Sequence, residues 1–146
     1  MGELQGKANL QDAKRYGYQR LVVWRNAYIL RCRIYEISVR FSRQEMKRVS
    51  QMRDAARSVK QNIQEGYARG SLKEYIQSLV VSRGSLAELE GDVQDCRDDG
   101  LITDAEFREL EELIGKTEYL FKRLLTALRR QDAEAWKSRN RLEVYN

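Results

Sequence analysis

The spacing of apolar residues is the feature that most constrains how this 146-residue chain folds. In its first periodic segment, apolar side chains recur every three or four residues from Val23 to Phe41, so they share one face of a helix. The chain contains no proline, a residue that would interrupt long helices. The same spacing returns three times along the chain. We therefore predict four helices, over residues 20–41, 44–67, 72–99 and 103–130.

The third predicted helix has the most regular pattern, because its apolar stripe keeps a strict alternation of fours and threes. The stripe consists of Tyr75, Leu79, Ser82, Leu86, Leu89, Val93 and Cys96. Such a heptad pattern is typical of helices that pack nearly parallel in bundles. The stretch 62–74 forms a tight corner between two antiparallel helices. The sequence therefore predicts an all-α, antiparallel up-down-up-down four-helix bundle.

Capping signals mark the ends of these helices. A serine or threonine followed three residues later by glutamate predicts a capping box, in which each side chain bonds the backbone N–H of the other residue. Three such pairs stand at the starts of predicted helices, at Ser42–Glu45, Ser71–Glu74 and Thr103–Glu106. Glycine adopts positive φ without strain. We therefore expect Gly66 and Gly70 to end the second helix and Gly100 to end the third.

Two further positions carry structural expectations. Gly84 and Ser85 place small side chains inside the third helix, where a glycine costs about 1 kcal/mol relative to alanine, so we expect a close helix crossing there. Asn62 and Glu65 lie beside the apolar stripe of the second helix. We expect them to brace the corner, with Glu65 bonding Arg69 or an arginine of another helix. The alternative is a polar patch at a subunit interface or in the pore of a ring.

The periodic segments form one domain over residues 20–130. We expect a flexible N-terminal arm over residues 1–19 and a helical C-terminal extension over residues 131–146. No run of about 18 apolar residues suggests a membrane helix, and residues 1–19 lack the apolar core of a secretory signal. Cys32 and Cys96 fall within helical patterns. We expect them to be reduced, buried thiols in a cytoplasmic protein.

Residue types needed for catalysis are scarce. The chain has no histidine, which is the usual base near neutral pH and the commonest metal ligand. A di-iron carboxylate bundle needs Glu-x-x-His pairs, and these are therefore absent. The segment Gly66–Gly70 lacks the Gly-Lys-Ser/Thr ending of a phosphate loop. We expect no enzymatic activity, no metal and no cofactor.

Charge is distributed unevenly along the chain. Residues 1–73 hold 16 Lys/Arg and 6 Asp/Glu, a net charge of +10, whereas residues 74–146 hold 11 Lys/Arg and 16 Asp/Glu, a net charge of −5. Three interpretations remain open: an ordinary solvated surface, a basic face that binds polyanions, and attraction between opposite charges of neighbouring subunits.

The polyanion interpretation names specific side chains on the first two helices. The candidate phosphate contacts are Arg25, Arg31, Arg33, Lys47, Arg48, Arg53, Arg57 and Lys60. Rows of cations along a helix can follow a nucleic-acid backbone without reading its sequence. Trp24, Tyr28 and Tyr35 lie near these cations and are candidates for stacking on unpaired bases. The alternative places these aromatic residues in the core or in an interface.

Six stretches in register resemble one family. They are Leu21–Trp24 followed by Ala27, Leu30, Ile34 and Tyr35; Gln51–Ala56; Asn62–Gly66; Ser71–Tyr75; Gly84–Glu90; and Gly100–Ile102. Their order and spacing resemble the bacterial four-helix-bundle proteins encoded in intervening sequences of large-subunit ribosomal RNA genes. The resemblance covers residues 21–130. Ser42 and Lys60 stand where that family often has proline, which adds a positive charge to the second helix.

The resemblance implies a left-handed bundle that assembles into a ring, commonly a homopentamer. It also implies kinship with the accessory variability determinant of diversity-generating retroelements, a basic pentameric bundle that binds nucleic acid and a reverse transcriptase. The first functional hypothesis is therefore a non-catalytic accessory factor that binds RNA or DNA, with a reverse transcriptase as a partner. The second is an assembly or protein-interaction module whose charges act between subunits.

Overall fold

The computed structural model describes residues 17–145, with side chains described as far as residue 135. Most of the predicted N-terminal arm, residues 1–16, lies outside the described residues. Within these residues, four α-helices make up the fold: α2 (Val22–Ser38), α3 (Met46–Ala68), α4 (Leu72–Asp98) and α5 (Asp104–Tyr145). Two short 3-10 helices, η1 (Gly17–Arg20) and η2 (Arg43–Glu45), precede α2 and α3. The described residues contain no strand, so the all-α four-helix prediction is confirmed.

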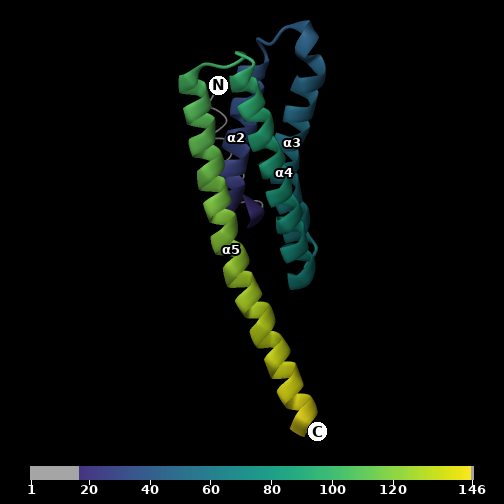
Figure 1. The fold of residues 1–146 in the computed structure, drawn as a ribbon. Helices are drawn as coiled ribbons and strands as arrows, with labels where there is room; N and C mark the ends of the chain where they lie inside the picture. The colour runs from purple at the N-terminus through teal and green to yellow at the C-terminus, as the bar shows by residue number, and fades with distance from the viewer. Residues whose placement is uncertain (1–16, 146) are drawn as a thin grey trace.

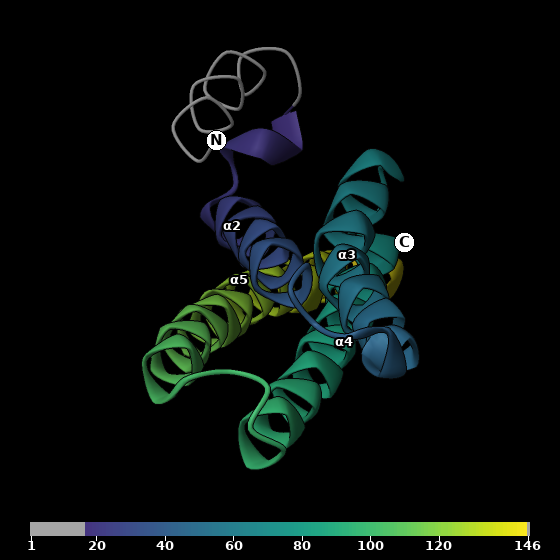
Figure 2. The same cartoon turned by 90° about the horizontal axis from the view of Figure 1, so that it is seen from above.

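Consecutive helices are joined at alternating ends of the bundle (Figure 1). Viewed from above, α3 and α5 lie on either side of α2, and α4 packs against both α3 and α5 (Figure 2). Each helix therefore has two neighbours, and the apolar stripes meet between them. Every helix in the described part of the chain is too short or too polar to cross a lipid bilayer.

Helix α5 includes both the predicted fourth helix of the bundle and the segment after residue 130 that was expected to be a helical extension. It continues without interruption to Tyr145 and extends beyond the ends of the other three helices (Figure 1). The physical reason lies in the composition, because the chain has no glycine after Gly115 and no proline at all. Nothing in the sequence therefore stops the helix where its apolar stripe ends.

The predicted apolar stripes form the core. Its largest fully enclosed apolar side chains are Phe121, Leu30, Ile34, Ile63, Leu79, Leu86, Leu89, Leu110 and Leu125. Burying a side chain of this size contributes about 1.5–3 kcal/mol of transfer free energy. In α5 the buried stripe runs through Leu125, four residues after Phe121, because a straight helix drifts relative to a seven-residue repeat. Tyr67, four residues after the buried Ile63 on α3, is 45% exposed.

Two buried hydroxyls and the thiol of Cys96 also belong to the interior. Thr117 Oγ1 donates to the Leu113 carbonyl at 2.7 Å, and Ser82 Oγ donates to the Val59 carbonyl. These bonds remove the cost of enclosing a polar group. Cys96 is buried with its sulfur 3.5 Å from that of Met52, as expected for a core thiol. Cys32 is only half-buried, so its predicted place in the core is wrong.

The capping predictions had different outcomes. Thr103 and Glu106 form the complete box, with Thr103 N–H donating to Glu106 at 2.9 Å and Glu106 N–H donating to Thr103 Oγ1 at 3.1 Å. At Ser71, the hydroxyl accepts from the Glu74 N–H at 3.3 Å. The predicted box at Ser42 is wrong, because its side chain makes no capping hydrogen bond. There the chain enters the short η2 turn before α3 begins.

Two glycines, Gly66 and Gly84, have roles opposite to those predicted, and two others end helices as predicted. Gly70 (φ +76°) and Gly100 (φ +72°) adopt the left-handed conformation and end their helices as expected. Gly66 instead lies buried inside α3, where a Cβ would come within 2.5 Å of the Ser78 Cβ. Gly66 is therefore the position at which α3 closely approaches α4. Gly84 was predicted for that role, but a Cβ there would meet nothing within 4 Å.

Candidate nucleic-acid interface

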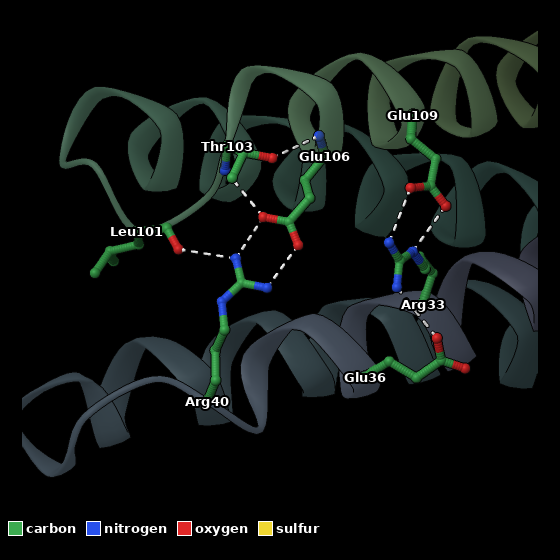
Figure 3. A network of polar contacts seen from close by, with 7 residues as sticks. All are labelled: Arg33, Glu36, Arg40, Leu101, Thr103, Glu106 and Glu109. Carbon is green, nitrogen blue, oxygen red and sulfur yellow. Dashed lines mark hydrogen bonds and ion pairs between the residues drawn. The ribbon is translucent and has the colours of Figure 1, made fainter.

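Arg33 is already paired with acidic side chains. Its Nε and Nη2 donate to the two carboxylate oxygens of Glu109 on α5, at 2.7 and 3.0 Å (Figure 3). Its Nη1 also donates to Glu36 Oε2 at 3.2 Å. The hydrogen bonds to Glu109 raise the pKa of Arg33. Since this forked pair satisfies the guanidinium and neutralises its charge, Arg33 is not a free phosphate contact.

Arg40 repeats this arrangement seven residues further along the chain, in the turn just after α2. Its guanidinium donates to both carboxylate oxygens of Glu106 and to the Leu101 carbonyl (Figure 3). Glu106 therefore bonds both Arg40 and its capping partner Thr103. The hydrogen bond from Arg40 lowers the pKa of Glu106 to about 2. The interface between α2 and α5 is thus lined by compensated charges.

Lys47 and Arg48 lie on the α4 side of α3 among carboxylates. Arg48 Nη2 is 2.7 Å from Asp99 Oδ2, and its Nε is 3.0 Å from Glu45 Oε2. Lys47 and Arg48 line a cleft of about 390 Å³ together with Asp92 and Asp95. Burial, followed by the neighbouring Glu88 and Asp95, raises the pKa of Asp92. Acidic groups therefore offset both cations locally.

Arg25 lies at the start of α2, beside η1. Its Nε donates to the Gln19 carbonyl at 2.9 Å, which ties the start of α2 to the preceding turn. Its side chain is exposed. Arg25 sits six residues before Arg31 and contributes to a different part of the surface from the cations described next.

Four of the predicted cations form a basic patch where α2 meets α3. We define the α2/α3 basic patch as Arg31, Arg53, Arg57 and Lys60. The guanidinium carbons of Arg31 and Arg53 lie 4.2 and 4.5 Å from the centre of the Tyr35 ring. Arg53 also donates to Ser38 Oγ at 2.9 Å and to the Tyr35 carbonyl at 3.4 Å. Cation–π contacts and neutral acceptors hold these guanidinium groups without cancelling their charge.

Lys60 shows the electrostatic consequence of this clustering. Its pKa is lowered by burial first, then by the positive charges of Arg31 and Arg57. Its Nζ lies 3.4 Å from Gln64 Oε1, a neutral acceptor. Among residues 17–135, no carboxylate oxygen lies within 4 Å of a charged nitrogen of the basic patch. The patch is therefore a concentration of uncompensated positive charge.

The three aromatic side chains predicted to stack on bases are all at least half-buried. The indole of Trp24 is only 3% exposed, and its Nε1 donates to Gln64 Oε1 at 3.0 Å. The proposed stacking of Trp24 on bases is therefore wrong, and the alternative of a core residue is correct. Tyr28 and Tyr35 are half-buried.

The polar residues of the corner are only partly as predicted. Asn62 Nδ2 donates to the carbonyl and hydroxyl oxygens of Ser58, both at 2.9 Å. The Ser58 hydroxyl lies 2.8 Å from that of Ser85, so this network links α3 to α4. Glu65 and Arg69 are exposed, and Glu65 forms no ion pair within the described part of the chain. Its predicted bracing role is wrong.

Sequence analysis missed two residues of these networks. Ser58 connects Asn62 to Ser85, and Gln64 accepts hydrogen bonds from both Trp24 and Lys60. Each lies four residues from a predicted site residue, Ser58 before Asn62 and Gln64 after Lys60. Side chains four apart are neighbours on a helix surface. Both residues could therefore have been predicted from their spacing of four residues to a candidate site residue.

Fold and surface together define an all-α four-helix-bundle protein with one uncompensated basic face. Comparison with protein families matches residues 19–123 to the family 23S rRNA-intervening sequence protein. The chain therefore belongs to this family, and the resemblance that its motifs suggested is confirmed. A search of curated protein sequences finds no match.

Proposed function

We propose that this protein is a non-catalytic accessory factor that binds nucleic acid through phosphate contacts made by the α2/α3 basic patch. One observation carries the proposal. The four cations of the patch have no carboxylate partner among residues 17–135, whereas Arg33, Arg40 and Arg48 each have one. Clustered like charges repel each other, and a polyanion would relieve that repulsion.

The arrangement of the patch suits a phosphate backbone. Arg53, Arg57 and Lys60 follow one face of α3 at spacings of four and three residues. A helix rises 1.5 Å per residue, so these three cations span about 10 Å along the axis. Arg31 extends the row across to α2. Contacts of this kind give affinity without sequence specificity, because they touch phosphates rather than base edges.

The family supports the choice of ligand. Its name refers to the intervening sequences of 23S rRNA, which makes RNA, or the DNA that encodes it, the polyanion of interest. The reverse-transcriptase partner remains a prediction from the family resemblance. Copurification with a reverse transcriptase encoded in the same cell would test that prediction separately.

Charge reversal tests the proposal directly. The variant Arg57→Glu with Arg53→Gln removes charge from the patch, and Lys116→Glu with Lys122→Gln removes the same charge from exposed positions of α5. We expect the patch variant to weaken binding of a fluorescent RNA or DNA duplex at least about tenfold, and the α5 variant about twofold or less. Equal losses in both variants, or no binding by the unmodified protein at low salt, would contradict the proposal.

The alternative function is a homo-oligomeric assembly module, for which the resemblance predicts five copies. The outer face of α4 favours it, because Val80 and Val81 are 40% and 47% exposed and open space surrounds Gly84. Exposed apolar side chains beside a glycine would allow another helix to approach closely.

Light scattering separates the two functions. Gly84→Arg should reduce the subunit count if α4 forms the interface, whereas Gly115→Arg, at an exposed glycine of α5 that also has open space around it, should not. If charge reversal on the basic patch breaks the oligomer instead of nucleic-acid binding, the patch belongs to the assembly interface.

A further inference from the structure

The aromatic side chains near the basic patch indicate which form of nucleic acid it accepts. Proteins that bind single strands without sequence preference stack bases on exposed aromatic rings, which strengthens binding by about tenfold per base. Three aromatic residues lie near the patch, namely Trp24, Tyr28 and Tyr35. The contacts of each ring decide whether a base can reach it.

The rings of Trp24 and Tyr28 stack on each other, so each ring covers one face of the other. Their rings stack with centres 5.4 Å apart and an angle of 23° between the planes, and Tyr18 packs edge-on against Trp24 at 5.3 Å. Trp24 is buried, as described above. Burial, followed by the nearby Cys32 thiol, raises the pKa of the Tyr28 hydroxyl. This pair therefore packs inward and does not form a stacking platform.

The Tyr35 ring is covered by the cations of the patch itself. The guanidinium carbons of Arg31 and Arg53 lie 4.2 and 4.5 Å from its centre. Hydrogen bonds to Ser38 and to the Tyr35 carbonyl hold Arg53 in place. A base could stack on Tyr35 only by displacing a guanidinium, and that would remove one of the charges available for phosphate.

We infer that the α2/α3 basic patch binds the phosphate backbone of a double helix rather than unpaired bases. This inference rests on the proposed function. Without a stacking platform, affinity comes from charge alone, and a duplex presents one phosphate per about 1.7 Å of its axis. A flexible single strand offers a lower charge density and must also be ordered on binding. The patch lies on two packed helices, so it is a rigid surface suited to a rigid duplex.

The test compares ligands of equal length on the unmodified full chain. Fluorescence anisotropy would measure binding of a 20-base-pair RNA duplex, the DNA duplex of the same sequence, and unstructured 20-nucleotide oligouridine and oligothymidine. We expect either duplex to bind at least about tenfold more tightly than the single strand of the same chemistry. Comparison of the two duplexes then shows whether RNA or DNA is preferred.

The outcomes separate this inference from the function on which it rests. Single strands that bind as tightly as duplexes, with affinity lost in the Arg57→Glu variant, would overturn the duplex inference and leave the proposed function standing. No binding to any of the four ligands at low salt would overturn both.

A tyrosine variant adds a second measurement. Tyr35→Leu removes the ring on which Arg31 and Arg53 pack, so it should weaken duplex and single-strand binding by similar factors. The control Tyr119→Leu, at an exposed tyrosine of α5, should weaken neither. Circular dichroism would confirm that both variants are folded. If Tyr35→Leu weakens single-strand binding about tenfold more than duplex binding, Tyr35 stacks on bases and the inference is overturned.

Discussion

The two sides of α2 differ in how their cations are compensated. Toward α5, Arg33 and Arg40 form forked pairs with Glu109 and Glu106. Toward α3, Arg31 packs over Tyr35, and no carboxylate within the described part of the chain pairs with it. The excess of positive charge in the first half of the chain is therefore partly cancelled inside the bundle. Four of the cations that remain lie together on the α3 side of α2, which net charge alone would not reveal.

The largest expected effect is the salt dependence of duplex binding. If the four patch cations contact phosphates, raising salt from 50 to 200 mM should weaken binding on the order of a hundredfold, because each contact releases about 0.9 counterion. Arg57→Gln should reduce the slope of log affinity against log salt by about one, whereas Arg33→Gln should leave it unchanged. Anisotropy titrations at several salt concentrations would measure both slopes. Equal slopes in the two variants would remove the distinction between the two sides.

The next largest effect concerns the contribution of the Arg40–Glu106 pair to the free energy of unfolding. Glu106→Ala removes the acceptor of both Arg40 and the Thr103 N–H, so we expect the free energy of unfolding to fall by about 1–2 kcal/mol. Urea denaturation would measure it. The control is Glu74→Ala at the start of α4, where the exposed glutamate side chain accepts no capping bond and the loss should stay below about 0.5 kcal/mol. Equal losses would mean that neither the pair with Arg40 nor the bond to Thr103 stabilises the fold.

A smaller effect should appear on acidification. The pKa of Glu106 is about 2 in the folded protein, below its ordinary value of 4.5. Because the folded pKa is depressed, the stabilisation is complete above pH 4.5 and is lost as the pH falls toward 2. Melting temperatures of the unmodified protein and of Glu106→Gln should therefore converge across that interval. A difference that stays constant with pH would show that Glu106 stabilises the bundle without its charge.

The smallest effect tests whether a compensated cation can be released. Glu109→Gln leaves Arg33 with the single acidic neighbour Glu36. Since both partners of the lost pair are partly exposed, unfolding free energy should change by less than about 0.5 kcal/mol. Duplex binding should rise by no more than about threefold, because the released charge lies away from the patch. A larger gain in affinity would place the nucleic acid on the α5 side of α2.

Local signals predicted the fold well because they depend on neighbouring residues. The stripe from Val23 to Ile37 is buried as its spacing indicates, and Gly70 and Gly100 end helices as expected. Predictions that required knowledge of another helix were less accurate. The same type of residue has opposite roles at Gly66 and Gly84, since only Gly66 faces a close neighbour. A glycine in a sequence does not show which helix lies opposite it.

The predictions for the candidate site also differ in accuracy according to whether they depended on one helix or on the packing of another helix against it. The sequence alone determined that α2 and α3 carry rows of cations, because helical spacing assigns residues to faces. It did not determine which of those cations remain charged toward solvent. Arg33 and Arg31 are two residues apart, yet one meets Glu109, 76 positions away, and the other meets an aromatic ring. Only the packing of α5 and α3 against α2 decided this, because electrostatic compensation depends on distance in space and not along the chain.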